Sequence, residues 1–163
     1  MTLSQTTEDY LKTIYILEAD TGDKGVSTKD IAVGMNVSAA SVTSMMKRLA
    51  EMGLVAHESY YGVRLTETGR KIALEIIRHH RLLELYLKEI MGYSWDQVHD
   101  EAEKLEHHIS EKFEDTIAEL LNDPTHDPHG DPIPTKDGVM PKMASRPLTK
   151  AKPGKEYIVG RVK

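Results

Sequence analysis

The stretch from His99 to His108 contains the side chains best suited to chemistry. It reads His-Asp-Glu-Ala-Glu-Lys-Leu-Glu-His-His. The composition of its later part favours a helix, and residues three and four apart on a helix are neighbours, so we expect Glu103, Glu106 and His107 on one face. Two carboxylates and an imidazole within about one turn suit a divalent metal ion. Taken alone, however, the stretch favours a solvated acidic face, the more common arrangement, so spacing by itself does not establish a metal site.

Length and composition place the chain among ordinary globular proteins. Its 163 residues, 39% hydrophobic and 29% charged, allow one domain or two small ones. No run reaches the roughly 18 apolar residues of a membrane helix, and the N-terminus lacks the basic and apolar segments of a signal peptide. The lack of cysteine in the sequence excludes disulfides and thiolate ligands. We therefore expect a cytoplasmic protein that does not bind a membrane.

The formal net charge of −5 is unevenly distributed along the chain. Residues 67–121 hold 7 basic and 13 acidic side chains, whereas residues 122–163 hold 8 basic and 5 acidic ones. The acidity is thus concentrated around the stretch from His99 to His108. Because an acidic protein binds a polyanion poorly, a DNA-binding function would require something that offsets this charge.

Residues 1–72 have the pattern of a winged helix-turn-helix DNA-binding domain. A helix is predicted over residues 4–19, where apolar side chains recur at helical spacing. Ser27 fits the N-cap of a short second helix, and Ser38 fits the N-cap of a longer third helix. Residues 55–65 alternate around Tyr-Tyr-Gly and are predicted to form a hairpin. Three helices followed by a hairpin predict the winged helix-turn-helix fold.

The third helix is predicted to contact DNA. Its positions Val42, Met45, Met46 and Leu49 form a side that we expect to be buried. The outer positions combine small hydroxyl-bearing residues at the N-terminal end with two cations further along, which suits entry into the major groove. The predicted DNA-binding residues are Ser38, Ala39, Ala40, Ser41, Thr43, Ser44, Lys47 and Arg48.

A helical dimerisation domain is predicted to follow, so that the fold as a whole is mainly α. A long helix from Thr66 to about Met91 carries His80 and Glu84 four residues apart. We expect a short helix over about residues 94–100 and then one helix over about residues 101–121. The apolar stripe of that last helix is suited to packing in a dimer.

We expect the helical domain to span residues 73–134 and a tail to follow over residues 135–163. Residues 157–162 alternate like a strand, although the sequence offers no obvious strand to pair with them. His126 and His129 lie in a stretch punctuated by proline and glycine. Histidines in a loop can bind a metal ion, but the more common arrangement is a solvent-facing side chain, and we assign both to the surface of the loop.

Five motifs spread over residues 6–134 are characteristic of one protein family. They are Thr-Thr-Glu-Asp-Tyr-Leu-Lys-Thr-Ile-Tyr (6–15), Arg-His-His-Arg-Leu (78–82), Val-His-Asp-Glu-Ala-Glu (98–103), Glu-His-His (106–108) and Gly-Asp-Pro-Ile-Pro (130–134). In these motifs the sequence resembles the diphtheria-toxin-repressor family of metal-dependent transcriptional regulators, and it is most similar to the manganese-responsive branch. The resemblance implies a winged helix-turn-helix followed by a helical dimerisation domain, with two metal positions between them.

The resemblance also implies two sets of metal ligands. Asp9, Glu103, Glu106 and His107 would form the first set, and His80, Glu84 and His99 would form the second. Iron-type members have a methionine at the position of Asp9 and a cysteine at that of Glu103. Carboxylates at both positions suit Mn²⁺ better than sulfur does, and Fe²⁺ also binds carboxylate and imidazole. We therefore expect about two Mn²⁺ or Fe²⁺ ions per subunit.

Three further features bear on this assignment. Some manganese-type members have a carboxylate at the position of Lys12, which cannot bind a metal while protonated, so we expect two separated ions instead of a closely spaced pair. His79 and His108 belong to neither ligand set and are expected to face solvent or the domain interface. The tail from Leu148 resembles the start of the family's SH3-like domain, which a truncated chain or a short variant would explain.

The resemblance implies a metal-dependent transcriptional repressor and no enzymatic activity. A metal-loaded homodimer would bind palindromic double-stranded operator DNA and repress metal-uptake genes, without an organic cofactor. An ion bound by both domains would fix the separation of the two recognition helices of the dimer. Two alternatives are a winged-helix regulator that senses a small organic ligand and a metallohydrolase that uses the Glu/His cluster to activate water.

Overall fold

The chain divides into two compact units, Met1–Ile76 and Ile77–Lys163. The computed structural model describes residues 3–21, 24–58, 62–142 and 148–162. Among these residues, no helix combines the length and the apolar content that a bilayer crossing requires. The division falls within one helix, α4 (Glu67–Glu89).

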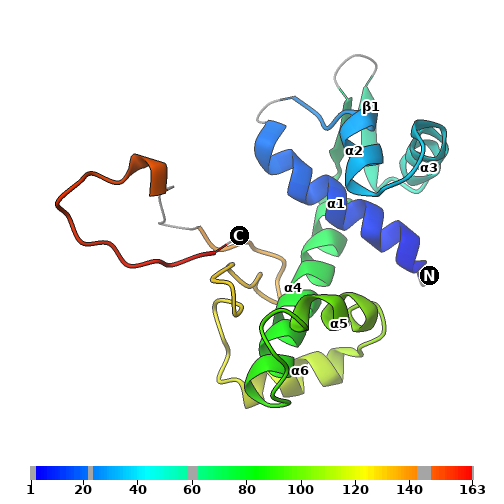
Figure 1. Ribbon diagram of the computed structural model, residues 1–163. Coiled ribbons are helices and arrows are strands. Elements are labelled where there is room, and N and C mark those ends of the chain that lie inside the picture. The colour runs from blue at the N-terminus through cyan, green and yellow to red at the C-terminus, as the bar shows by residue number, and fades with distance from the viewer. Residues whose placement is uncertain (1–2, 22–23, 59–61, 143–147, 163) are drawn as a thin grey trace. The chain divides into compact units, whose positions relative to one another are not determined.

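Unit 1 is a winged helix-turn-helix, as predicted (Figure 1). Its helices are α1 (Gln5–Thr21), α2 (Thr28–Gly34) and α3 (Ala39–Glu51), followed by the strands β1 (Val55–Glu58) and β2 (Gly62–Leu65). The helix α1 packs against α2 and β2, while α3 packs against α2 and β1. Apolar side chains from all these elements form one buried cluster, in which the residues with no exposed surface are Leu11, Ile14, Val26, Ile31, Val42, Leu49, Val63 and Ala73.

Both predicted serine caps are confirmed. The Ser27 hydroxyl accepts a hydrogen bond from the Asp30 amide at 3.1 Å, and the Ser38 hydroxyl accepts one from the Ser41 amide at 3.2 Å. Each cap satisfies a backbone donor that the first turn of a helix leaves without a partner. The caps therefore explain why α2 and α3 begin where the sequence predicted.

The predicted hairpin is also present. The strands β1 and β2 pair antiparallel, from Val55 opposite Leu65 to Glu58 opposite Gly62. The predicted turn at Tyr60-Tyr61 lies outside the described residues. At the base of the hairpin, an added Cβ on Gly69 would lie 2.0 Å from the Leu54 carbonyl oxygen, so only glycine allows the start of α4 to approach the chain this closely.

Unit 2 contains the remainder of α4 together with α5 (Val98–Leu105) and α6 (Glu111–Leu120). The prediction of one helix over residues 101–121 is wrong, because the chain turns after α5 and begins a new helix. The Ser110 hydroxyl accepts a hydrogen bond from the Phe113 amide at 3.3 Å and so forms the N-cap of α6. The predicted short helix over residues 94–100 is likewise wrong, because residues 95–97 form a turn and α5 begins at Val98.

The strand predicted over residues 157–162 does not form. Residues 151–162 contain neither helix nor strand, and the described part of the tail has a single 3₁₀ turn at Leu148–Lys150. An isolated segment with no partner strand cannot satisfy its backbone groups in a sheet. The Val162 amide instead donates a hydrogen bond to the His129 carbonyl at 2.9 Å.

Candidate functional site

The helix α3 presents the predicted DNA-binding residues on its outer face. All eight of them are exposed, whereas Val42, Met46 and Leu49 are buried on the opposite side. The Thr43 hydroxyl donates a hydrogen bond to the Ala39 carbonyl at 2.9 Å. An exposed, small and hydroxyl-rich helix start is suited to close contact with base edges.

A second candidate site begins on α4, where His80 and Glu84 lie four residues apart. Both side chains are buried, and His80 Nε2 lies 3.0 Å from Glu84 Oε1. His99 of α5 joins them, because its Nδ1 lies 3.1 Å from His80 Nε2 and 3.2 Å from Glu84 Oε1. The three residues that the resemblance assigns to the second ligand set thus converge in unit 2.

The other nitrogen of His80 faces the residues around the end of α5. His80 Nδ1 lies 2.5 Å from Glu106 Oε2 and 3.4 Å from Glu103 Oε2. Glu106 is the C-cap residue of α5, its side chain is fully buried, and its Oε1 lies 3.3 Å from His107 Nε2. His80 of the second predicted ligand set therefore contacts Glu106 and Glu103 of the first set, and Glu106 in turn contacts His107.

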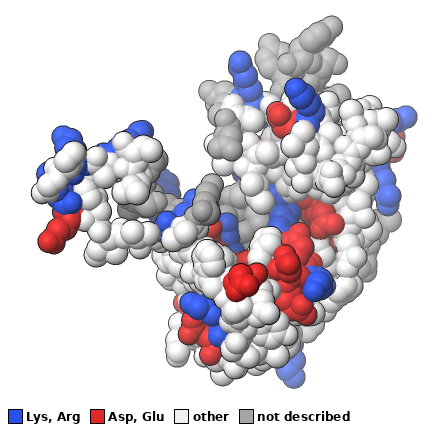
Figure 2. Space-filling model, in the orientation of Figure 1, with Lys and Arg blue, Asp and Glu red and all other residues white. Residues whose placement is uncertain are grey.

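Glu103, Glu106 and His107 do not share one face of a continuous helix, contrary to the prediction. The helix α5 ends at Leu105, so Glu106 and His107 follow it, and only Glu103 projects from the helix itself. The side chains are 48%, 0% and 5% exposed, respectively. The alternative of a solvated acidic face is therefore wrong for Glu106, although acidic side chains do gather over α5 (Figure 2).

The electrostatics of the cluster keep a central carboxylate charged. Burial raises the pKa of Glu84, but its contacts with His80, His99 and His129 outweigh burial and lower the pKa below its ordinary value. The donor atoms of His80, His99 and Glu103 also lie within 4.8 Å of one another. Deprotonated carboxylates beside imidazole nitrogens are the donors that Mn²⁺ and Fe²⁺ bind, so the residues present fit such an ion.

His129 differs from its predicted position, and His79 does not face solvent. His129 is not a free surface residue of its loop, because its Nε2 lies 3.7 Å from Glu84 Oε1 and its ring lies 4.5 Å from that of Trp95. His79 is buried and donates from Nδ1 to the Glu106 carbonyl at 3.0 Å. Helical spacing in the sequence could not predict either contact, because His129 lies in a loop and the carbonyl that His79 contacts lies in the turn after α5.

The second nitrogen of the His79 ring contacts a buried ion pair between Arg78 and Glu114. Its Nε2 lies 3.2 Å from Glu114 Oε2, and Arg78 Nε donates to Glu114 Oε1 at 2.5 Å. The hydrogen bond with His79, helped by Arg78 and opposed by burial, lowers the pKa of Glu114 to about 2. Glu114 thus links α6 to the α4 residues next to His80.

Asp9 is the one predicted metal ligand that belongs to unit 1. It lies on α1 and is partly buried, and Lys12 follows it by three residues. The other six predicted ligands belong to unit 2.

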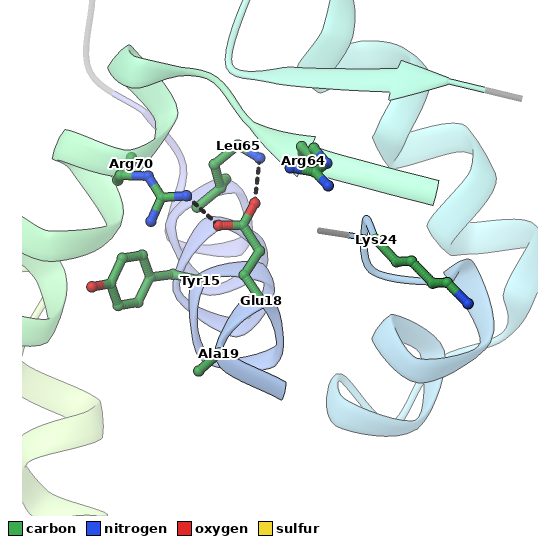
Figure 3. A pocket seen from close by; sticks show the side chains of 7 residues that line it. All are labelled: Tyr15, Glu18, Ala19, Lys24, Arg64, Leu65 and Arg70. Carbon is green, nitrogen blue, oxygen red and sulfur yellow. Dashed lines mark hydrogen bonds and ion pairs between the residues drawn. The ribbon is translucent and has the colours of Figure 1, made fainter. Parts of the chain in front are cut away.

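Unit 1 also contains a cavity of about 270 Å³ beside the C-terminal half of α1 (Figure 3). Glu18 Oε1 accepts a hydrogen bond from the Leu65 amide at 2.8 Å, and its Oε2 pairs with Arg70, whose guanidinium lies over the Tyr15 ring. Both carboxylate oxygens therefore connect α1 to β2 and to the start of α4, which is a structural role. The lining residues are Tyr15, Glu18, Ala19, Lys24, Arg64, Leu65 and Arg70.

Unit 1 thus presents an exposed amphipathic helix, and unit 2 brings histidine and carboxylate side chains together around the buried His80. Two family models match the chain. The N-terminal DNA-binding domain of the iron-dependent repressors matches residues 2–63, and their metal-binding and dimerisation domain matches residues 66–135. The chain therefore belongs to the iron-dependent repressor family, which confirms the resemblance seen in the sequence.

Individual relatives agree with this assignment. The chain is 39% identical over 134 residues to the iron-dependent repressor IdeR of Mycobacterium tuberculosis, covering 81% of this chain and 56% of IdeR. It is 37% identical over 114 residues to the HTH-type transcriptional regulator MntR of Lysinibacillus sphaericus, covering 70% of this chain and 80% of MntR. The chain thus spans little more than half the length of the mycobacterial relative.

A solved structure with a similar fold is a manganese-dependent transcriptional repressor in complex with manganese. It is 43% identical to this chain, with a TM-score of 0.85, and the match covers 96% of this chain and 72% of that one. Relatives named for iron and for manganese are therefore both similar to this chain.

Proposed function

We propose that this protein is a transcriptional repressor that binds palindromic operator DNA as a homodimer when it carries Mn²⁺ or Fe²⁺, and that it controls metal-uptake genes. The observation that carries the proposal is the convergence of His80, Glu84, His99 and Glu106 around one another in unit 2. Both carboxylates, Glu84 and Glu106, are almost completely buried, and buried carboxylates require cationic or hydrogen-bonding partners.

The donor atoms support Mn²⁺ or Fe²⁺ as the ion. All are carboxylate oxygens or imidazole nitrogens, and the sequence has no cysteine to favour softer metals. The two nitrogens of His80 face different ligands. Its Nδ1 lies near Glu106 and Glu103, and its Nε2 lies near Glu84 and His99. We propose that these sets account for about two ions per subunit.

Asp9 enters the proposal through the resemblance. We propose that it shares one ion with Glu103, Glu106 and His107, so that residues of both units hold the same metal. The bound ion would supply positive charge among carboxylates that otherwise repel one another. Two divalent ions would also offset most of the formal charge of −5 that opposes binding to DNA.

The proposed DNA contacts are those of α3. Its hydroxyl-bearing N-terminal residues would reach base edges, while Lys47 and Arg48 would contact phosphates. Residues 66–135 match the metal-binding and dimerisation domain of the family, and a homodimer would place two recognition helices on the two halves of a palindrome. Since its partner is operator DNA, we propose that the protein acts in the cytoplasm and has no catalytic role.

The test is DNA binding with and without metal. A palindromic duplex selected from a random library in the presence of Mn²⁺ should bind in fluorescence anisotropy and dissociate when EDTA is added. Asp9→Asn should lose this response while its circular dichroism spectrum stays unchanged, and Glu8→Gln, on the same helix, is the matched control. Titrations with Mn²⁺, Fe²⁺, Co²⁺ and Zn²⁺ would rank the metals.

Two outcomes would contradict the proposal. DNA binding that is equal with and without EDTA would exclude metal control and favour a regulator of another ligand. Hydrolysis of a generic ester that disappears in Glu103→Ala would favour a metallohydrolase.

A further inference from the structure

Arg81 of α4 holds the loop over residues 127–132 against α4, within unit 2. Its Nη1 donates to the Pro132 carbonyl, and its Nε lies 3.7 Å from Asp127 Oδ2. Its Nη2 lies 3.7 Å from Asp131 Oδ1. Because Arg81 is next to His80 in sequence, the same turn of α4 carries a central residue of the metal cluster and the anchor of this loop.

The loop is also held internally by Asp127. Its Oδ1 accepts hydrogen bonds from the His129 and Asp131 amides, both at 2.8 Å. This arrangement fixes the backbone on both sides of Gly130. The His129 imidazole is thereby directed toward Glu84, with Nε2 at 3.7 Å from Oε1.

The tail packs onto the same loop through three contacts. Arg161 forms an ion pair with Asp131, and the Val162 amide donates to the His129 carbonyl at 2.9 Å. An added Cβ on Gly130 would lie 2.0 Å from the Gly160 carbonyl oxygen, so the close approach of the tail requires glycine at this position. The Asp131 side chain is 16% exposed and that of Arg161 is 31% exposed, so water screens this ion pair only partly.

We infer that Asp131 and Arg161 are positioning residues for the metal cluster, which they serve by holding His129 against Glu84. The tail contacts the backbone of the residue whose side chain touches Glu84, so docking of residues 160–162 and ion binding at the cluster favour each other. Such coupling is reciprocal: the docked tail raises the affinity for the ion, and the ion stabilises the docked tail by the same factor. This inference rests on the proposed function, because it requires an ion at Glu84.

The first experiment measures Mn²⁺ affinity by electron paramagnetic resonance, which detects free Mn²⁺ in the absence of DNA. Arg161→Ala should weaken Mn²⁺ binding about tenfold, as loss of an outer-shell partner typically does. Arg161→Lys should recover part of that affinity, since it restores the charge facing Asp131. Lys155→Ala, an exposed cation of the same tail, is the matched control and should bind Mn²⁺ like the wild type.

The second experiment measures the reverse direction of the coupling. Exchange of the Val162 amide hydrogen should slow when Mn²⁺ is added to the wild type and should be fast with or without Mn²⁺ in Asp131→Asn. Thermal unfolding of each variant, recorded without metal, separates this effect from a general loss of stability. A variant that only weakened the fold would change the melting temperature without changing Mn²⁺ affinity, and the inference would then be wrong.

The two proposals fail in different ways. If the wild-type protein bound no Mn²⁺, or if His80→Ala bound it equally well, the proposed metal site itself would be wrong. If wild-type binding were normal and depended on His80, but Arg161→Ala and Asp131→Asn both bound Mn²⁺ with unchanged affinity, only the positioning role would be overturned.

Discussion

The helix α3 and the His80 cluster bring their side chains together in different ways. All eight predicted DNA-binding residues belong to α3 or its cap, so one amphipathic element determines their positions. The cluster combines residues of α4, α5 and the turn after α5. A site on one element depends on local sequence, whereas a site assembled from several depends on where each helix ends and how it packs.

The largest effect is expected from His80, which contacts both ligand sets. His80→Ala should reduce Mn²⁺ affinity by more than about a hundredfold, beyond the loss typical of an outer-shell partner. It should also destabilise the metal-free protein by about 1–3 kcal/mol, since Glu84 and Glu106 would lose a buried partner. Calorimetric titration and urea unfolding measure the two effects. His108→Ala, at an exposed position, should change neither.

The next largest effect is expected from Glu114, whose carboxylate pairs with Arg78 and His79 next to His80. Its pKa is lowered from 4.5 to about 2, so its ion pair stabilises the fold fully above about pH 4.5 and progressively less as the pH falls toward 2. Glu114→Gln should therefore cost about 3 kcal/mol at pH 7. The difference from the wild type should shrink below pH 4.5. Urea unfolding at pH 7 and pH 3 would show this, and an equal difference at both values would contradict it.

Substitution of the two cations of α3 should weaken DNA binding without changing the affinity for Mn²⁺, in contrast to substitution of His80. The double substitution Lys47→Ala and Arg48→Ala should weaken binding to every DNA sequence by about tenfold and lower the salt dependence of the affinity by about two ions. Anisotropy titrations at several salt concentrations measure this. Glu51→Gln lies on the same helix and should not weaken DNA binding. A loss confined to one sequence would indicate base contacts instead.

The smallest effects are expected at the N-caps of α3 and α6. Substituting each cap shows whether the DNA-binding helix and the metal cluster depend on it in the same way. Ser38→Ala and Ser110→Ala should each cost about 1 kcal/mol of stability, because each removes a capping hydrogen bond. Only Ser110→Ala should also weaken Mn²⁺ binding, since Ser110 begins α6 just after the turn that carries Glu106. Equal effects on Mn²⁺ affinity would show that the turn does not control the cluster.

The sequence was sufficient to predict unit 1 but only part of unit 2. Cap residues and a clear apolar period predicted α2, α3 and the hairpin. The apolar stripe continues through the break between α5 and α6, so the periodicity predicts one helix. The only local signal of the break is Ser110, which caps α6. A single helix would place Glu106 beside Glu103 on one face, whereas the turn after α5 buries Glu106 completely.

The cluster itself was predicted through family resemblance and not through spacing. His80 and Glu84 are a simple i, i+4 pair, but nothing in their spacing indicates that His99, fifteen residues beyond Glu84, lies 3.2 Å from it. His129 was assigned to the surface for the same reason, because a loop has no periodicity from which a contact can be predicted. Sequence patterns describe elements, and the contacts between elements require the folded chain.

The ring contact between Trp95 and His129 has a practical consequence. Trp95 is the single tryptophan of the chain, and its indole lies 4.5 Å from the imidazole of the loop that the tail contacts. Its ultraviolet emission therefore comes from one known place and is sensitive to the charge and distance of that imidazole. A stopped-flow fluorescence trace of the unlabelled wild-type protein would follow this loop in real time, so the speed of the response becomes measurable without a dye.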